Sequence, residues 1–80
     1  MRLDKYLKVS RIIKRRTIAN EVCDAGHAIV NGKTARASYD VKLGDVIEIS
    51  FGAKKTKYEV LSAPEYATKE SSSEMYKEIQ

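Results

Sequence analysis

Cationic side chains crowd the first sixteen residues of the chain. Lys14, Arg15 and Arg16 stand directly before Thr17, where the sequence predicts the start of a helix. A helix start carries about half a positive charge and exposes unpaired amides, so stability alone would favour acids there. Cations at this point favour an anion site, because amides and guanidinium groups can converge on one ligand. We expect that ligand to be a phosphate.

The excess positive charge lies entirely at the N-terminal end. Residues 1–16 hold seven bases against one acid, a net charge of +6, whereas residues 17–61 are neutral and residues 62–80 carry −2. A solvated surface usually mixes signs, so this distribution favours a nucleic-acid footprint over a merely basic face. The candidate RNA-binding residues are Arg2, Lys5, Lys8, Arg11, Lys14, Arg15, Arg16 and Thr17.

Residue types typical of catalysis are scarce. His27 is the only histidine, and its position after Gly26 favours a surface role. Cys23 is the only cysteine, which excludes an internal disulfide and a cysteine-cluster metal site, and we expect it in the core. Asp4 either orients a nearby arginine or balances a crowded basic helix. The sequence therefore predicts no enzyme, no cofactor and no metal site.

The length and hydropathy of the chain limit its number of domains and its relation to membranes. Eighty residues predict one domain with a small core. No apolar run approaches the roughly 18 residues of a membrane span, and no apolar leader segment follows the first charges. We expect a cytoplasmic protein that does not enter membranes.

Two amphipathic segments predict helices. In residues 2–10 the apolar side chains recur with helical spacing and leave Asp4, Lys5 and Lys8 on the opposite side. A second helix is predicted from Thr17 as N-cap to Gly26, which suits the left-handed residue that ends a helix. The first helix presents Leu3, Tyr6 and Leu7 to the core, and the second presents Ile18, Val22 and Ala25. Ile12 and Ile13 should attach the connector to the core.

The pattern then changes to short strands. Asn31-Gly32 is a strong signal for a two-residue hairpin turn, and Gly44-Asp45 predicts a turn before an apolar run at 46–51. Residues 55–61 alternate as a further strand. The predicted fold class is α+β, with two short N-terminal helices packed on a small, mostly antiparallel sheet.

The last nineteen residues have a different composition. Residues 62–80 are rich in serine and acids, so we expect a mobile tail after a domain at 1–61. Ser73 could cap a short helix through residues 74–79.

Few aromatic residues are available to stack on bases. The six aromatic residues include none in a run typical of base-stacking sheets, and Tyr39, Tyr58 and Phe51 are interpreted as core or rim residues. The basic helical end is therefore the predicted RNA-binding surface, and it should recognise phosphates and RNA shape more than sequence.

Residues 1 to about 61 closely resemble the small RNA-binding domain named after ribosomal small-subunit protein four, the S-four (S4) domain. The shared features are the RLD opening, the R-T pair at the second helix, the glycine before a V-N-G hairpin and the later GD-x-I. His27 departs from the basic residue that the family often has there. The resemblance implies RNA binding, with Arg2 of RLD and Arg16 of R-T as the first candidates.

The chain also resembles the stand-alone RqcP family of bacterial ribosome-associated quality control, which is related to a ribosome-binding heat-shock protein. That resemblance implies a factor, monomeric off the ribosome, that binds large subunits still carrying peptidyl-tRNA. It would contact large-subunit rRNA and hold the tRNA while a partner, RqcH, adds a C-terminal alanine tail. The alternatives are a general rRNA or tRNA chaperone, an assembly factor, or the RNA-targeting subunit of a separate modifying enzyme.

Overall fold

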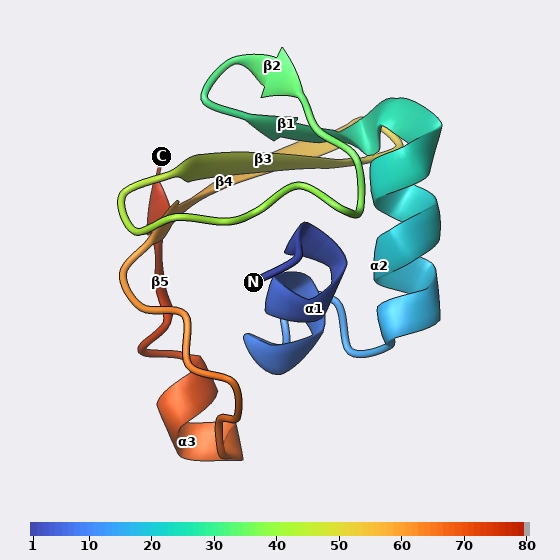
Figure 1. Ribbon diagram of the computed structural model, residues 1–80. Coiled ribbons are helices and arrows are strands. Elements are labelled where there is room, and N and C mark those ends of the chain that lie inside the picture. The colour runs from blue at the N-terminus through green and yellow to red at the C-terminus, as the bar shows by residue number, and fades with distance from the viewer. Residues whose placement is uncertain (80) are drawn as a thin grey trace.

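The N-terminal amphipathic segment forms α1 (Leu3–Val9) in a computed structural model that describes residues 1–79 (Figure 1). No side chain caps this helix. Instead, the carbonyls of Tyr39 and Ala37 accept hydrogen bonds of 2.8 and 3.2 Å from the first two amides of α1. The tertiary structure thus satisfies groups that a helix start leaves unpaired. The predicted apolar stripe is confirmed, since Leu3, Tyr6 and Leu7 are all fully buried.

α2 (Arg16–Val22) begins two residues earlier than predicted. Arg15 is the N-cap, its side chain makes no capping hydrogen bond, and Thr17 lies inside the helix. The helix continues into one π-helical turn, Cys23–His27. Gly26 adopts a φ of 87° there, which confirms the predicted left-handed end of the helix.

The buried face of α2 differs from the predicted one. Ala19 and Cys23 are buried, whereas Ile18 is 42% exposed and Ala25 is also exposed. Val22 packs at the edge of the core. α2 contacts α1, and small side chains on the contact face let two helices lie close together. The buried face of α2 therefore carries the small side chains Ala19 and Cys23.

The sheet has five strands in the order β2-β1-β3-β4-β5, and every neighbouring pair is antiparallel. Asn31 and Gly32 have φ angles of 52° and 83°, as a tight hairpin turn between β1 and β2 requires. The predicted α+β class with two N-terminal helices on an antiparallel sheet is confirmed. The strands are β1 (Ala28–Val30), β2 (Lys33–Thr34), β3 (Val46–Phe51), β4 (Lys54–Val60) and β5 (Tyr76–Ile79).

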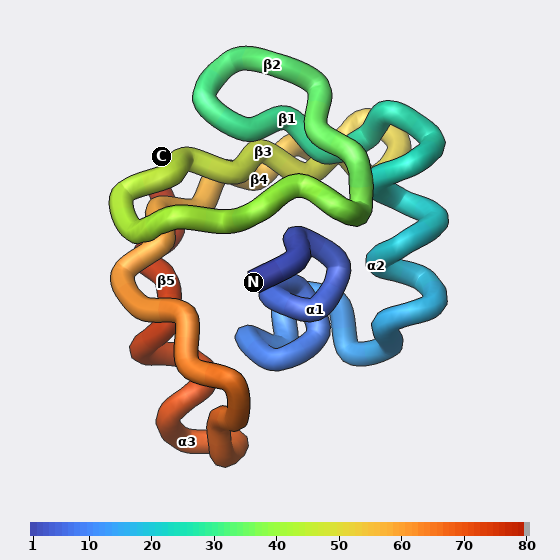
Figure 2. The backbone as a smooth tube through the Cα atoms, viewed as in Figure 1, coloured from blue at the N-terminus to red at the C-terminus, as the bar shows by residue number. Residues whose placement is uncertain are grey.

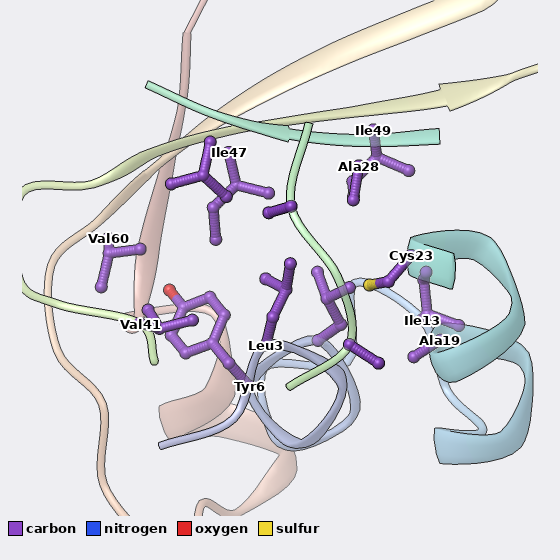
Figure 3. Packing of buried hydrophobic residues seen from close by; sticks show 14 of the residues in the cluster. Leu3, Tyr6, Ile13, Ala19, Cys23, Ala28, Val41, Ile47, Ile49 and Val60 are labelled. Atoms are coloured by element: carbon purple, nitrogen blue, oxygen red, sulfur yellow. The ribbon is translucent and has the colours of Figure 1, made fainter. Parts of the chain in front are cut away.

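The core lies between one face of the sheet and the two helices (Figure 3). Ile47 and Ile49 of β3 contribute from the sheet, and Ile13 of the connector is buried among them, as predicted. Tyr39 and Tyr58 are partly buried against this core, while Phe51 is 51% exposed, so the three aromatics are core or rim residues.

The segment between β2 and β3 crosses the molecule between the sheet and α1 (Figure 2). Asp45 fixes its end, because the carboxylate accepts hydrogen bonds from Asn31 Nδ2 at 2.9 Å, Tyr39 Oη at 2.8 Å and the Lys42 amide at 2.9 Å. At its middle, Asp40 pairs with the N-terminal amine of Met1 at 2.8 Å. The crossing segment thereby ties the N-terminus to the sheet.

The C-terminal segment is part of the fold and not a separate tail. Residues 76–79 form β5, which pairs with β4, and Met75 is 1% exposed. The Tyr6 hydroxyl donates a 2.8 Å hydrogen bond to the Met75 carbonyl. The short helix is α3 (Lys69–Ser72), capped by Thr68, so the predicted helix after Ser73 is wrong. Pairing with β5 removes the open edge that β4 would otherwise expose. Gln80 lies outside the described residues.

Candidate RNA-binding surface

A groove runs along α1, the α1–α2 connector and the start of α2, and the segment before α3 forms its far side. Its volume is about 360 Å³. Five of the eight predicted RNA-binding residues line it, which brings together cations that lie up to eleven positions apart in the chain. We call this the basic groove; it is lined by Lys5, Lys8, Val9, Arg11, Lys14, Arg16, Glu65, Tyr66 and Ala67.

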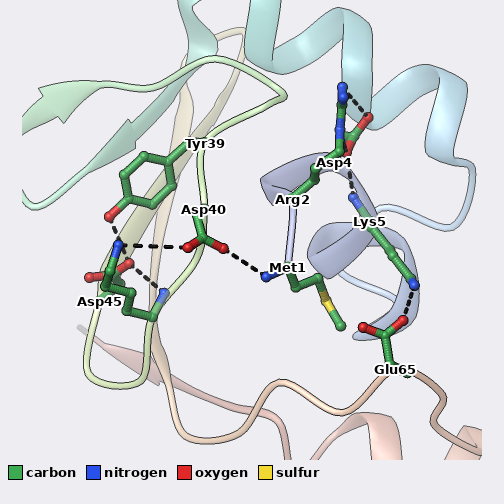
Figure 4. Close-up of polar contacts among 9 residues, drawn as sticks. Met1, Arg2, Asp4, Lys5, Tyr39, Asp40, Asp45 and Glu65 are labelled. Carbon is green, nitrogen blue, oxygen red and sulfur yellow. Dashed lines mark hydrogen bonds and ion pairs between the residues drawn. The ribbon is translucent and has the colours of Figure 1, made fainter.

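Asp4 organises the two arginines that the family resemblance singled out. Arg2 donates to its carboxylate from Nε at 3.2 Å and from Nη2 at 3.4 Å, and Arg16 Nη2 donates at 3.4 Å. Asn20 Nδ2 and the backbone amide of Lys5 also donate hydrogen bonds to this carboxylate, at 3.2 and 2.8 Å. Asp4 is only 2% exposed, which contradicts the predicted solvent-facing position. Figure 4 shows Arg2 and Asp4 between the two helices.

The charge of Asp4 is maintained despite its burial. Burial alone would raise the pKa of this carboxyl, because a buried charge loses hydration. The hydrogen bonds from Arg2, Asn20, Arg16 and the Lys5 amide outweigh burial and lower the pKa below its ordinary value of 3.8. A charged Asp4 therefore fixes two guanidinium groups while about half of each arginine side chain stays exposed. Of the two roles left open for Asp4, the structure supports orientation of arginine.

A second hollow of about 390 Å³ lies beside the basic groove. It is formed by Asp4, Arg16, Thr17, Asn20 and Glu21, so Arg16 borders both depressions. Thr17 is exposed there. Its hydroxyl is thus on the candidate surface, although it does not cap α2.

Lys5 is already engaged within the protein. Its ammonium group forms an ion pair with Glu65, from the segment before α3 (Figure 4). The pair lowers the pKa of Glu65, through the hydrogen bond and the charge of Lys5. Lys5 therefore supports the wall of the basic groove and contributes less free positive charge than the sequence predicts.

Three other groove cations have no such partner. Lys8, Arg11 and Lys14 are exposed, and none forms an ion pair with any residue in the described range 1–79. Arg15 is equally exposed and unpaired within that range, but it lies outside the groove lining. These side chains are the cations most available to an external anion.

Arg11 occupies an unusual backbone conformation. Its φ is 63°, in the left-handed region just after the end of α1, where glycine is the usual residue. An arginine there costs about 1 kcal/mol or more relative to an unstrained residue. Arg11 nevertheless lines the basic groove with an exposed side chain.

Sequence reasoning missed two groups of this surface. Asn20 is not among the predicted binding residues, yet its Nδ2 donates to Asp4; it follows Arg16 by four residues, a helical spacing that places the two side chains on one face. Glu65 and Tyr66 were assigned to a tail, and no local pattern signals that they close the groove. His27 is exposed, as predicted.

Two structural features bear on other classes of function. No helix within residues 1–79 is long and apolar enough to cross a membrane. In the same range no three histidine, cysteine or acidic side chains gather closely enough to hold a metal ion. Cys23 is buried, and burial raises the pKa of its thiol to about 12, so it stays protonated near neutral pH.

Comparison with known proteins identifies relatives over nearly the whole chain. The family described as S4 domain matches residues 1–47. A protein of Streptococcus pneumoniae named RQC P-site tRNA stabilizing factor is 53% identical over 79 residues, covering 99% of this chain and 90% of the relative. A Bacillus subtilis protein of the same name is 50% identical over 76 residues, covering 95% and 88%.

Solved structures agree with this grouping. Vibrio cholerae Heat Shock Protein 15, described as trimeric, has a TM-score of 0.90 and 25% identity, covering 99% of this chain and 81% of that one. The solution structure of hypothetical protein HP1423 has a TM-score of 0.84 and 29% identity, covering 100% and 98%. By family match, identity and fold, the chain belongs to the S4 domain family, among relatives named RQC P-site tRNA stabilizing factor.

Proposed function

We propose that this protein is a non-enzymatic RNA-binding factor of ribosome-associated quality control that stabilises tRNA in the P site of the large ribosomal subunit. The relatives at about half identity carry that role in their name. The observation that carries the proposal is the basic groove, where cations from α1, the connector and α2 converge on one surface. Such a surface suits the phosphates of folded RNA.

Binding combines two kinds of contact. Lys8, Arg11 and Lys14 attract RNA phosphates as exposed, unpaired charges. Arg2 and Arg16 are held by Asp4 and present planar guanidinium groups that can form paired hydrogen bonds with a phosphate. The first group supplies attraction, and the second fixes the orientation of the protein on the RNA.

In its cellular setting the protein is cytoplasmic and ribosome-associated. It contacts large-subunit rRNA and peptidyl-tRNA, acts as a monomer off the ribosome, and holds the tRNA while RqcH adds a C-terminal alanine tail. It supplies position and charge rather than chemistry. The name of the relatives supports a role in quality control at the P-site tRNA. The RqcH partnership, the alanine tail and the monomeric state rest on the family resemblance alone.

Co-sedimentation tests the proposal. The protein is mixed with purified large subunits that carry peptidyl-tRNA or lack it, and the bound fraction is measured. We expect clearly tighter binding to tRNA-carrying subunits and more alanine tailing when RqcH is added. Equal binding to both subunits would replace the proposal with a general rRNA-binding or assembly role. Co-purification with an RNA-modifying enzyme, without large subunits, would indicate a targeting subunit.

A further inference from the structure

Tyr66 is the most exposed large hydrophobic side chain in residues 1–79. Its exposed fraction is 90%, and it lines the basic groove beside Lys8 and Arg11. The ring has no aromatic partner in the described part of the chain, where the one aromatic pair is Tyr58–Tyr76. The fold therefore gains little stability from the ring of Tyr66.

The backbone that carries Tyr66 is anchored on both sides. Glu65 is tied to α1 by its ion pair with Lys5, and Ala67 packs against the core. Thr68 follows directly and caps α3, accepting a 3.0 Å hydrogen bond from the Ser71 amide. The ring thus projects from a segment whose neighbours on both sides contact the rest of the protein, so ligand stacking has to restrict mainly the side chain of Tyr66.

The cations that share the groove with Tyr66 determine the charge of a suitable ligand. Lys8, Arg11 and Lys14 line the same groove and have no acidic partner within residues 1–79. Arg11 is the groove cation with the left-handed φ of 63°. The groove thereby offers one flat aromatic surface and a cluster of free cations, which fits a ligand with a flat ring and an adjoining phosphate.

We propose that the basic groove holds one unpaired nucleotide of RNA, with its phosphate on Lys8, Arg11 and Lys14 and its base stacked on Tyr66. The inference rests on the proposed RNA-binding function and specifies the ligand of that site. Bases inside a duplex have both faces covered by their neighbours, whereas an unpaired base offers a face to an aromatic ring. The groove volume of about 360 Å³ lies at the small end of ligand sites, which suits a single nucleotide.

Short oligonucleotides test the stack directly. The probes are a single-stranded adenosine hexamer and a hexamer of the same ribose-phosphate backbone without bases, each with a terminal dye for anisotropy titration. We expect Tyr66→Ala to weaken binding of the adenosine hexamer roughly fivefold to a hundredfold, because stacking contributes that much per base. Tyr66→Phe keeps the ring and should bind within about twofold of the parent.

The base-free hexamer separates stacking from charge. The parent and Tyr66→Ala should bind it equally, because neither can stack on it. In the parent, the proton resonances of the Tyr66 ring should move upfield when the adenosine hexamer is added. Equal binding of the adenosine hexamer by the parent and Tyr66→Ala would overturn the inference, as would stronger competition by a hexaglutamate peptide than by the hexamer.

A cation variant distinguishes this failure from failure of the proposed function. Lys8, Arg11 and Lys14 are replaced together by alanine, and binding of both hexamers and of large subunits is measured. One outcome is that the triple variant loses binding to both hexamers and to large subunits while Tyr66→Ala binds all of them like the parent. In that case the groove still binds RNA and the stacking inference is wrong. If the cation variant binds all three like the parent, the groove is not the RNA site and both proposals fail.

Discussion

Asp4 determines how the residues around it can act. Its carboxylate is 2% exposed and accepts hydrogen bonds from Arg2, Arg16 and Asn20. A guanidinium already paired on one side still has donors on its outer edge, so each arginine can bridge the protein and an RNA phosphate. A lysine ammonium lacks that planar fork. The candidate surface therefore contains two classes of cation: arginines oriented by Asp4, and exposed cations without an ion-pair partner in residues 1–79.

Arg16→Lys tests the orientation. The substitution keeps the charge and removes the fork, so we expect a loss of large-subunit binding of roughly tenfold, with the thermal melt close to that of the parent. Lys8→Arg is the matched control, because it exchanges the same two residue types at an unpaired position, and it should change binding little. Parent-like binding by Arg16→Lys would show that Arg16 acts only through its charge. Unfolding of Arg16→Ala would show that Arg16 stabilises the fold by pairing with Asp4.

Arg11→Gly should move stability and binding in opposite directions. Glycine adopts a positive φ without strain, so chemical denaturation should show a gain of about 1 kcal/mol in the free energy of unfolding. Removal of a groove cation should at the same time weaken binding to large subunits. Arg11→Lys preserves the charge and the strain, and should leave both quantities near the parent values. A loss of stability in Arg11→Gly would contradict the assignment of strain.

The elements of the fold depend on contacts between distant segments. α1 has no side-chain cap and takes its first hydrogen bonds from the crossing segment between β2 and β3. β4 is paired on one side by β3 and on the other by β5, which comes from the last residues of the chain. The groove therefore depends on the whole fold, since α1 is held by the crossing segment and Ala67, before α3, packs against the core.

Met75→Ala tests the role of the C-terminal segment. The side chain is 1% exposed, so truncation should lower the free energy of unfolding by about 2–5 kcal/mol in a denaturant titration. Removal of residues 62–80 should be more damaging, because β4 would lose its partner strand. Tyr66→Ala, in the same segment but exposed, should lie within about 0.5 kcal/mol of the parent. Unchanged stability of Met75→Ala would restore the interpretation of this segment as a tail.

Acid should destabilise the packing of α1 on α2 through Asp4. The pKa of this carboxyl is lower in the folded than in the unfolded protein, so the unfolded state binds more protons as pH falls below about 4. The stability that Asp4 contributes is complete above its unfolded pKa and is lost as pH falls through its folded pKa. Asp4→Asn should be less stable than the parent at pH 7, and the difference should shrink toward pH 2. A pH-independent difference would show that the charge of Asp4 is not responsible.

Local patterns predict the parts of this fold that local physics determines. The stripe of α1 and the Asn31-Gly32 hairpin follow from helical spacing and from positive φ angles. The first residue of α2 cannot be predicted from a local capping pattern, because the Arg16 side chain is held by Asp4 and no side chain caps the helix. β5 was missed because Tyr76–Ile79 has no regular alternation and pairs only with a strand distant in sequence. The cations of the groove were predicted, whereas its wall at Glu65 and Tyr66 needed the tertiary fold.

For the molecule as a whole, charge is concentrated on one surface. The net charge of +4 results from +6 in residues 1–16, offset by −2 in residues 62–80. Folding places part of the acidic segment against the basic one, where Glu65 pairs with Lys5. The segment before α3 thus bounds the groove and leaves Lys8, Arg11 and Lys14 open to solvent.

We infer that these groove cations meet RNA phosphates on the large subunit. The most direct test is the slope of log affinity against log salt concentration for binding to tRNA-carrying subunits. We compare the parent, the triple alanine variant of Lys8, Arg11 and Lys14, and a control with Lys54 and Lys55 of β4 changed to alanine. We expect a steep parental slope that falls by roughly 0.7 to 0.9 for each phosphate contact removed, about 2 to 3 in total for the triple variant. The control should keep the parental slope. Equal slopes for the parent and the triple variant would show that Lys8, Arg11 and Lys14 do not contact RNA phosphates.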